Sequence, residues 1–148
     1  MILMSACLAG IDCKYNGGNN EIPQLKDLYE KGEAVLVCPE VMGGLPTPRL
    51  SSEIRGNKVY NTAGEDVTAN FVKGAEEALR IARKNGCTLA VLKADSPSCG
   101  SGQIYDGTFS HTKIQGDGIF AALCRKKGIT CLTELEYLER MDKNYESL

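Results

Sequence analysis

The chain has 148 residues, 43% of them hydrophobic, which is enough for one domain with a substantial core. Its 17 basic and 19 acidic residues leave a net charge of −2, and no basic stripe suggests a nucleic acid polymer as partner. The first residues contain neither a basic segment nor a long apolar run, so we expect no signal peptide and no membrane-spanning helix there. The expectation is a cytoplasmic protein of one domain, residues 1–148, that does not bind membranes.

Short apolar runs alternate with amphipathic stretches along the chain. Pro23 is typical of a helix start, Gly86 of a helix end, and Thr133 with Glu136 forms a capping box. In chain order the pattern predicts a strand at 1–7, a helix at 23–32, a strand at 33–39, a hairpin at 53–61 around Gly56 and Asn57, a helix at 68–85, a strand at 87–95, a tight turn at 106–107, a helix at 117–128 capped by Asp117, a strand at 129–132 and a last helix from 133.

Strands that alternate with helices predict an α/β fold. We expect a single three-layer domain with a mainly parallel sheet, Rossmann-like or flavodoxin-like, and the hairpin as a small excursion from it. In such sheets, ligands bind beyond the carboxyl ends of the strands. Residues that follow the predicted strands are therefore the candidates for a site.

Seven cysteines need an explanation in a chain with no Cys-x-x-Cys pair. A reducing compartment and an odd number argue against a disulfide framework. Cys7, Cys38 and Cys99 each lie at or just past the end of a predicted strand, so their thiols are expected at one sheet edge. Three converging thiols suit a soft metal or an iron–sulfur cluster, although simple burial is the alternative for any cysteine.

The other cysteines have a weaker case as ligands. Cys87, Cys124 and Cys131 fall in predicted strands or on the apolar face of a helix, where burial explains them. Cys13 lies in the first loop and remains open as a fourth ligand, a resolving thiol or an ordinary loop residue. The single histidine, His111, has no histidine partner and is expected in solvent.

Four longer segments carry a resemblance to a known family. The segments "SACLAGIDCKYNG", "CPEVMGGLPTPR", "LKADSPSCGSGQIYDGTF" and "GDGIFAAL" resemble, in this order, the thiouracil desulfidase family, and the resemblance covers residues 3–132. It implies a [4Fe-4S] cluster held by Cys7, Cys38 and Cys99, with one iron open to substrate. It also implies a small thiolated substrate and iron–sulfur assembly machinery as partners.

The activity implied by the resemblance is a non-redox desulfidation. Sulfur of a thiolated nucleobase, or of a similar small thiocarbonyl compound, would be replaced by oxygen and released as hydrosulfide. Glu40 would move the proton, or else cap nearby loop amides. Ser96 would position water or substrate, and Ser98 would do the same or bond a sulfide of the cluster. Alternatively, both serines stabilise the turn at Pro97.

Further polar residues and two other functions remain open. Arg49, Glu53 and Asp66 are expected to support loops, with Arg49 also able to face an anion. The amides at the start of the 117–128 helix could receive a carbonyl or an anion. The alternatives to a desulfidase are a zinc-thiolate hydrolase and a non-catalytic module that binds a cluster or metal.

Overall fold

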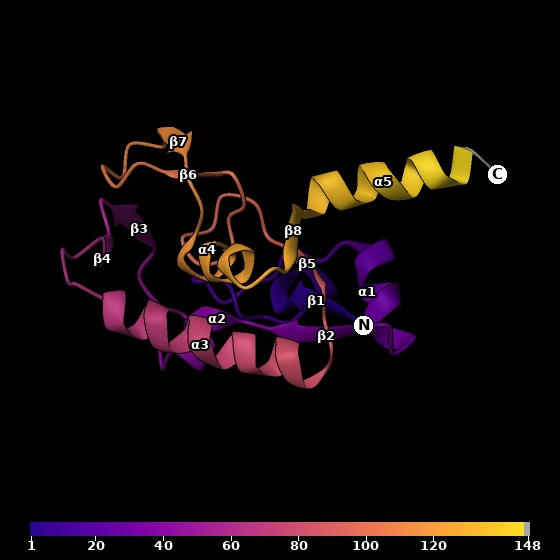
Figure 1. Cartoon of the computed structure of the whole chain (residues 1–148). Helices are drawn as coiled ribbons and strands as arrows, with labels where there is room; N and C mark the ends of the chain where they lie inside the picture. The colour runs from indigo at the N-terminus through magenta and orange to yellow at the C-terminus, as the bar shows by residue number, and fades with distance from the viewer. Residues whose placement is uncertain (147–148) are drawn as a thin grey trace.

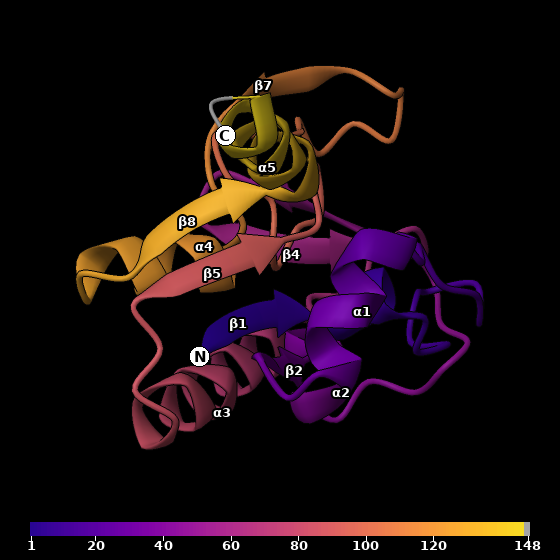
Figure 2. The same cartoon turned by 90° about the vertical axis from the view of Figure 1, so that its right-hand side faces the viewer.

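A computed structural model describes residues 1–146, and its centre is a parallel sheet of four strands. The strands are β1 (Ile2–Ser5), β2 (Ala34–Val37), β5 (Leu89–Leu92) and β8 (Thr130–Thr133), in the order β2-β1-β5-β8. Leu3 at the centre of β1 is in register with Val35 on one side and Ala90 on the other. Figure 2 shows the strands pointing the same way, so their carboxyl ends lie along one edge.

Helices cover both faces of this sheet, because alternate side chains of β1 enter two different cores. Leu3 belongs to a core with α3 (Thr68–Lys84) and α4 (Ile119–Lys126), whereas Met4 packs with α1 (Pro23–Glu30) and α5 (Glu134–Glu146). Figure 1 shows α1 and α5 on one side of the sheet and α3 and α4 on the other. The three-layer α/β fold expected from the sequence is confirmed. No helix within residues 1–146 has the length and apolarity needed to cross a bilayer.

Two hairpins lie together at one end of the molecule (Figure 1). The predicted hairpin is β3 (Ser52–Arg55) with β4 (Lys58–Asn61), and the second is β6 (Gln103–Tyr105) with β7 (Lys113–Gln115). The sequence indicated only a tight turn at 106–107 where the structure has a longer connection between β6 and β7. The hairpins are tied together by Glu53, whose Oε1 accepts the amides of Gly107 and Phe109 at 3.0 and 3.1 Å.

The start of α5 confirms the predicted capping box, but the predicted cap of α4 is wrong. Thr133 Oγ1 accepts the amide of Glu136 at 3.1 Å, and Glu136 Oε1 accepts the amide of Thr133 at 2.9 Å. Asp117 makes no cap; its carboxylate accepts the amide of Gly102 at 2.7 Å instead. The reason is a tertiary contact: backbone carbonyls of the 96–99 segment accept hydrogen bonds from the first amides of α4, so no amide is left for Asp117 to cap.

Two short helical turns follow β1 and β2 where the sequence predicted that the strands would continue. These are η1 (Ala6–Ala9) and α2 (Pro39–Met42), each too short to show a helical period. The α2 turn lies directly against α3, since a Cβ at Gly74 would come within 1.7 Å of the carbonyl oxygen of Pro39. Glycine at this position therefore lets α2, with Glu40 in its first turn, pack directly against α3.

Candidate active site

One cavity of about 390 Å³ opens at the carboxyl ends of β2, β1 and β5. Its wall includes the residues that directly follow these three neighbouring strands, and the outer wall includes residues of both hairpins. This is the place where an open α/β sheet binds ligands, and the volume lies in the usual range for small-molecule sites of about 300–1,000 Å³.

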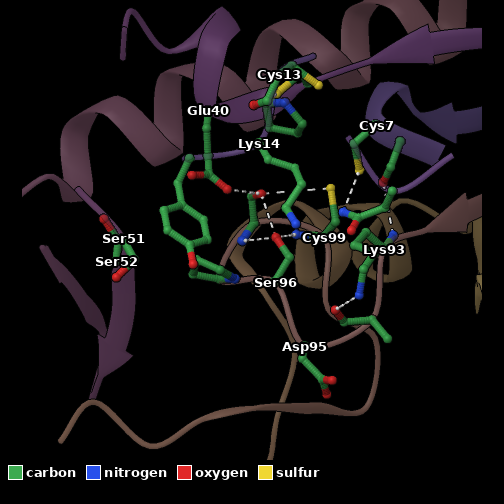
Figure 3. Close-up of a pocket in the computed structure, with 18 of the residues that line it drawn as sticks. Cys7, Cys13, Lys14, Glu40, Ser51, Ser52, Lys93, Asp95, Ser96 and Cys99 are labelled. Atoms are coloured by element: carbon green, nitrogen blue, oxygen red, sulfur yellow. Dashed lines mark hydrogen bonds between the residues drawn. The ribbon is translucent and has the colours of Figure 1, made fainter. Parts of the chain in front are cut away.

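Four of the seven cysteines line this cavity. Cys7 comes from η1 after β1, Cys38 directly follows β2, Cys99 comes from the turn after β5, and Cys13 from the loop that follows η1. Figure 3 labels Cys7, Cys13 and Cys99. The remaining three, Cys87, Cys124 and Cys131, are buried elsewhere in the core. All seven thiols are free.

The cavity thiols differ in environment. Cys99 is only 4% exposed, and this burial raises the pKa of its thiol. Burial also raises the pKa of Cys7, although Asn20 Nδ2 partly offsets this by donating a hydrogen bond to its Sγ at 3.5 Å. A hydrogen bond from the thiol of Cys13 lowers the pKa of Cys38 to about 7. A soft metal binds each of these thiols as a thiolate, so the thiol loses its proton when the metal binds.

The loop that carries Cys99 is fixed from both sides. Ser96 Oγ accepts the amides of Ser98 and Cys99 at 3.1 and 3.0 Å. The carbonyl of Ser98 accepts amides from the first turn of α4, and a Cβ at Gly118 would come within 2.6 Å of that carbonyl. The helix start proposed from the sequence as an anion site is therefore occupied by the protein's own loop, which sets the position of the Cys99 thiol.

Glu40 lies between an arginine and a serine. Its Oε1 accepts a bond from Arg49 Nε at 3.2 Å, and its Oε2 accepts one from Ser98 Oγ at 2.9 Å. The side chains of Glu40 and Arg49 are only 14% and 6% exposed, so each supplies the charge that the other needs in this largely buried position. Arg49 also donates to the carbonyl oxygens of Cys13 and Pro46, which joins Glu40 to two loops of the cavity wall.

The hydrogen bonds at Ser96 and Ser98 determine the acceptor to which each hydroxyl donates its proton. Ser96 Oγ accepts two amides, so its own proton is directed to Ser98 Oγ, 3.0 Å away. Ser98 then donates its single proton to Glu40, and the 3.7 Å contact between Ser98 Oγ and Cys99 Sγ cannot be made at the same time. The result is a directed chain from Ser96 through Ser98 to the carboxylate of Glu40. Figure 3 labels its two ends, Ser96 and Glu40.

The other polar residues named from the sequence have separate places. Glu53 lines the cavity and holds the β6–β7 connection, and exposed His111 lines the rim. Asp66 lies outside the cavity lining, where it accepts the amide of Thr68 at 2.9 Å.

Sequence reasoning missed two lysines of the cavity wall. Lys93 directly follows β5 and pairs with Glu134 at 3.3 Å, so its position after a strand could have indicated it. Lys14 lies within the loop after η1, where no periodic pattern marks it, and only its proximity to Cys7 and Cys13 in the sequence could have drawn attention to it.

Comparison with known proteins agrees with this geometry. The family model described as 2-thiouracil desulfurase matches residues 2–136. YbbK of Bacillus subtilis (strain 168), described as an uncharacterized protein, is 42% identical over 146 residues, covering 92% of this chain and 97% of its own. The solved structure of the [4Fe-4S]-dependent thiouracil desulfidase TudS is 42% identical and superposes with a TM-score of 0.90, covering 99% of this chain and 98% of that one. The chain belongs to the 2-thiouracil desulfurase family.

Proposed function

We propose that this protein is a [4Fe-4S]-dependent desulfidase that replaces the sulfur of a small thiolated pyrimidine by oxygen without net redox change. The observation that carries the proposal is the meeting of three strand-end thiols and the Glu40–Ser98 pair on one cavity. It is supported by the membership in the family and by the likeness to TudS over nearly the whole chain.

The residues present fit such a cluster. Cys7, Cys38 and Cys99 offer three soft thiolate donors from neighbouring strands, and we assign them as the ligands. A [4Fe-4S] cluster has four irons, so three ligands leave one iron for the substrate. A zinc-thiolate hydrolase needs three protein ligands on one zinc ion. Within residues 1–146, no three His, Cys, Asp or Glu side chains are grouped so that they could hold a single metal ion.

The chain's own residues then serve a substitution by water. When bound, the cluster supplies a Lewis acid with affinity for sulfur. Ser98 and Glu40 take the proton of the attacking water, because their hydrogen bond already directs a hydroxyl proton toward the carboxylate. The carbon–sulfur bond is exchanged for a carbon–oxygen bond, water supplies the oxygen, and sulfur leaves as hydrosulfide. No electron is gained or lost, so no reductant is needed.

The direct test is an anaerobic assay with 2-thiouracil. Protein with a reconstituted cluster should release one hydrosulfide for each uracil formed, with no added reductant. The loss of thiocarbonyl absorbance measures the consumption of 2-thiouracil, and a sulfide assay measures the hydrosulfide released. Iron and sulfide analysis of the same sample distinguishes a cluster from zinc. A fully loaded protein that releases no sulfide from any of a panel of thiolated pyrimidines would contradict the proposal.

Cys13 is not assigned as a ligand, and its replacement tests that assignment. The carbonyl oxygen of Cys13 accepts a bond from Arg49 at 2.8 Å, and this bond does not depend on the side chain at position 13. We expect Cys13→Ser to retain full iron content and activity within about tenfold of the parent, since a hydroxyl can still donate to Cys38. Loss of iron from this variant would show that Cys13 is a fourth ligand.

A further inference from the structure

The charges that line the cavity are balanced within the described chain, with one exception. Lys14 lines the cavity and is partly buried, yet among residues 1–146 its ammonium group has no ion pair and no hydrogen bond. The other ionised groups of the wall have partners: Glu40 with Arg49, Lys93 with Glu134, Asp95 with Lys113, and Glu53 with two backbone amides. Lys14 thus offers the cavity a free cationic donor.

The backbone of Lys14 is held on both sides, although its side chain is not. Its amide donates to the carbonyl of Gly18 at 3.1 Å, and its carbonyl accepts the amide of Gly17 at 3.0 Å. Arg49 binds the two flanking carbonyls, that of Cys13 through Nη2 at 2.8 Å and that of Tyr15 through its amide at 2.7 Å. Figure 3 shows the side chain extending from this loop toward the stretch that contains Ser96 and Cys99. The backbone bonds therefore fix the point on the cavity wall from which the side chain of Lys14 starts.

An ammonium group on a cavity wall with no acceptor from the protein is free to donate to a ligand oxygen, and such a charged hydrogen bond stabilises the bound ligand. The acceptor that a thiouracil brings, besides its sulfur, is the second exocyclic atom of the ring, a carbonyl oxygen. A thiopyrimidine without this oxygen leaves the ammonium unpaired when it enters the cavity. Sites that hydrogen-bond a polar group of their substrate discriminate against analogues that lack it.

We propose that Lys14 is a specificity-determining residue, whose ammonium group donates a hydrogen bond to the exocyclic oxygen of a thiouracil-type substrate. The cavity therefore selects thiopyrimidines that carry an oxo group in addition to the sulfur. This inference rests on the proposed desulfidation and adds to it the feature of the ring that is recognised.

The test compares substrates and products that differ by this one oxygen. Desulfidation converts 2-thiouracil to uracil and pyrimidine-2-thione to pyrimidin-2-one. We expect Lys14→Met, in cluster-loaded protein, to lower kcat/KM for 2-thiouracil by about 10- to 100-fold, the usual effect of losing a charged hydrogen bond, and to leave pyrimidine-2-thione unchanged. By calorimetry, the same variant should lose a similar factor in affinity for uracil and none for pyrimidin-2-one. Lys31→Met is the matched control, because Lys31 is on the surface at the end of α1, paired with Asp27 and outside the cavity lining.

The outcomes separate this inference from the function on which it rests. An equal loss for both ring types in Lys14→Met, or no loss for either, would overturn the role of Lys14. Lys14→Gln keeps a neutral donor and should lose less than Lys14→Met; it also serves as the test if Lys14→Met does not fold. A parent protein that releases no sulfide would refute the desulfidation, while the calorimetric comparison of uracil with pyrimidin-2-one would still decide the binding role.

Discussion

Replacement of Cys99 by serine is expected to have the largest effect of any single substitution in this protein. Cys99 is buried in a turn fixed by Ser96 and by the start of α4, so a nearby cysteine cannot move into its place. A serine hydroxyl is a poor ligand for iron in a site of soft donors. Iron and sulfide per chain should fall toward zero, and sulfide release from 2-thiouracil should fall at least about 10³-fold with loss of the Lewis acid.

Cys124→Ser is the matched control for this experiment. Cys124 is a fully buried cysteine of α4 that does not line the cavity. Its replacement buries a hydroxyl and should reduce the free energy of unfolding by about 1–3 kcal/mol while leaving the iron content intact. Thermal or denaturant unfolding measures the first effect and metal analysis the second. A Cys99→Ser variant that keeps both iron and activity would remove this residue from the ligand set.

The second large effect is expected for Glu40→Gln. The amide keeps the shape of the side chain and can still accept the bond from Arg49, but it cannot take a proton from Ser98. We therefore expect full cluster content with turnover reduced by about 10²–10⁴-fold, the usual contribution of a positioned acid or base. Cluster absorbance and single-turnover sulfide release measure the two quantities separately.

Glu77→Gln provides the comparison for the change from carboxylate to amide. Glu77 is exposed on α3, where it pairs with Arg80 at 3.1 Å. The Glu77→Gln substitution should therefore leave turnover unchanged. Parental turnover in Glu40→Gln would exclude Glu40 as the proton acceptor and leave the three-cysteine site standing. Loss of the cluster from Glu40→Gln would instead show a structural role, through the contact of Arg49 with the Cys13 loop.

Local signals in the sequence predicted most of the fold. Apolar runs indicated the four parallel strands, and the capping box of Thr133 and Glu136 marked the start of α5 correctly. Such features depend on residues within a few positions of each other. The short turns η1 and α2 were missed because a single helical turn has no period, and α2 is fixed by the approach of Gly74 to Pro39 across 35 positions of sequence.

The position of the site could also be predicted, because in a parallel sheet the topology brings together whatever follows the strands. Cys7, Cys38 and Cys99 were chosen for this reason, and all three line the cavity. The cap assigned to Asp117 failed because the competing acceptors of the α4 amides come from another segment, the carbonyls of Pro97 and Ser98.

The sequence by itself determined the four parallel strands, the four longer helices and the edge at which the thiols meet, since each of these follows from local periodicity and one topological rule. Only the tertiary structure decided the direction of the hydrogen bonds from Ser96 through Ser98 to Glu40. The bond from Ser98 to Glu40 joins residues 58 positions apart, and it depends on α2 docking against α3 and the 96–99 loop docking against α4. The tertiary structure alone also distinguished Lys14 from the other charged residues of the cavity, because whether a charge is paired depends on contacts between distant segments.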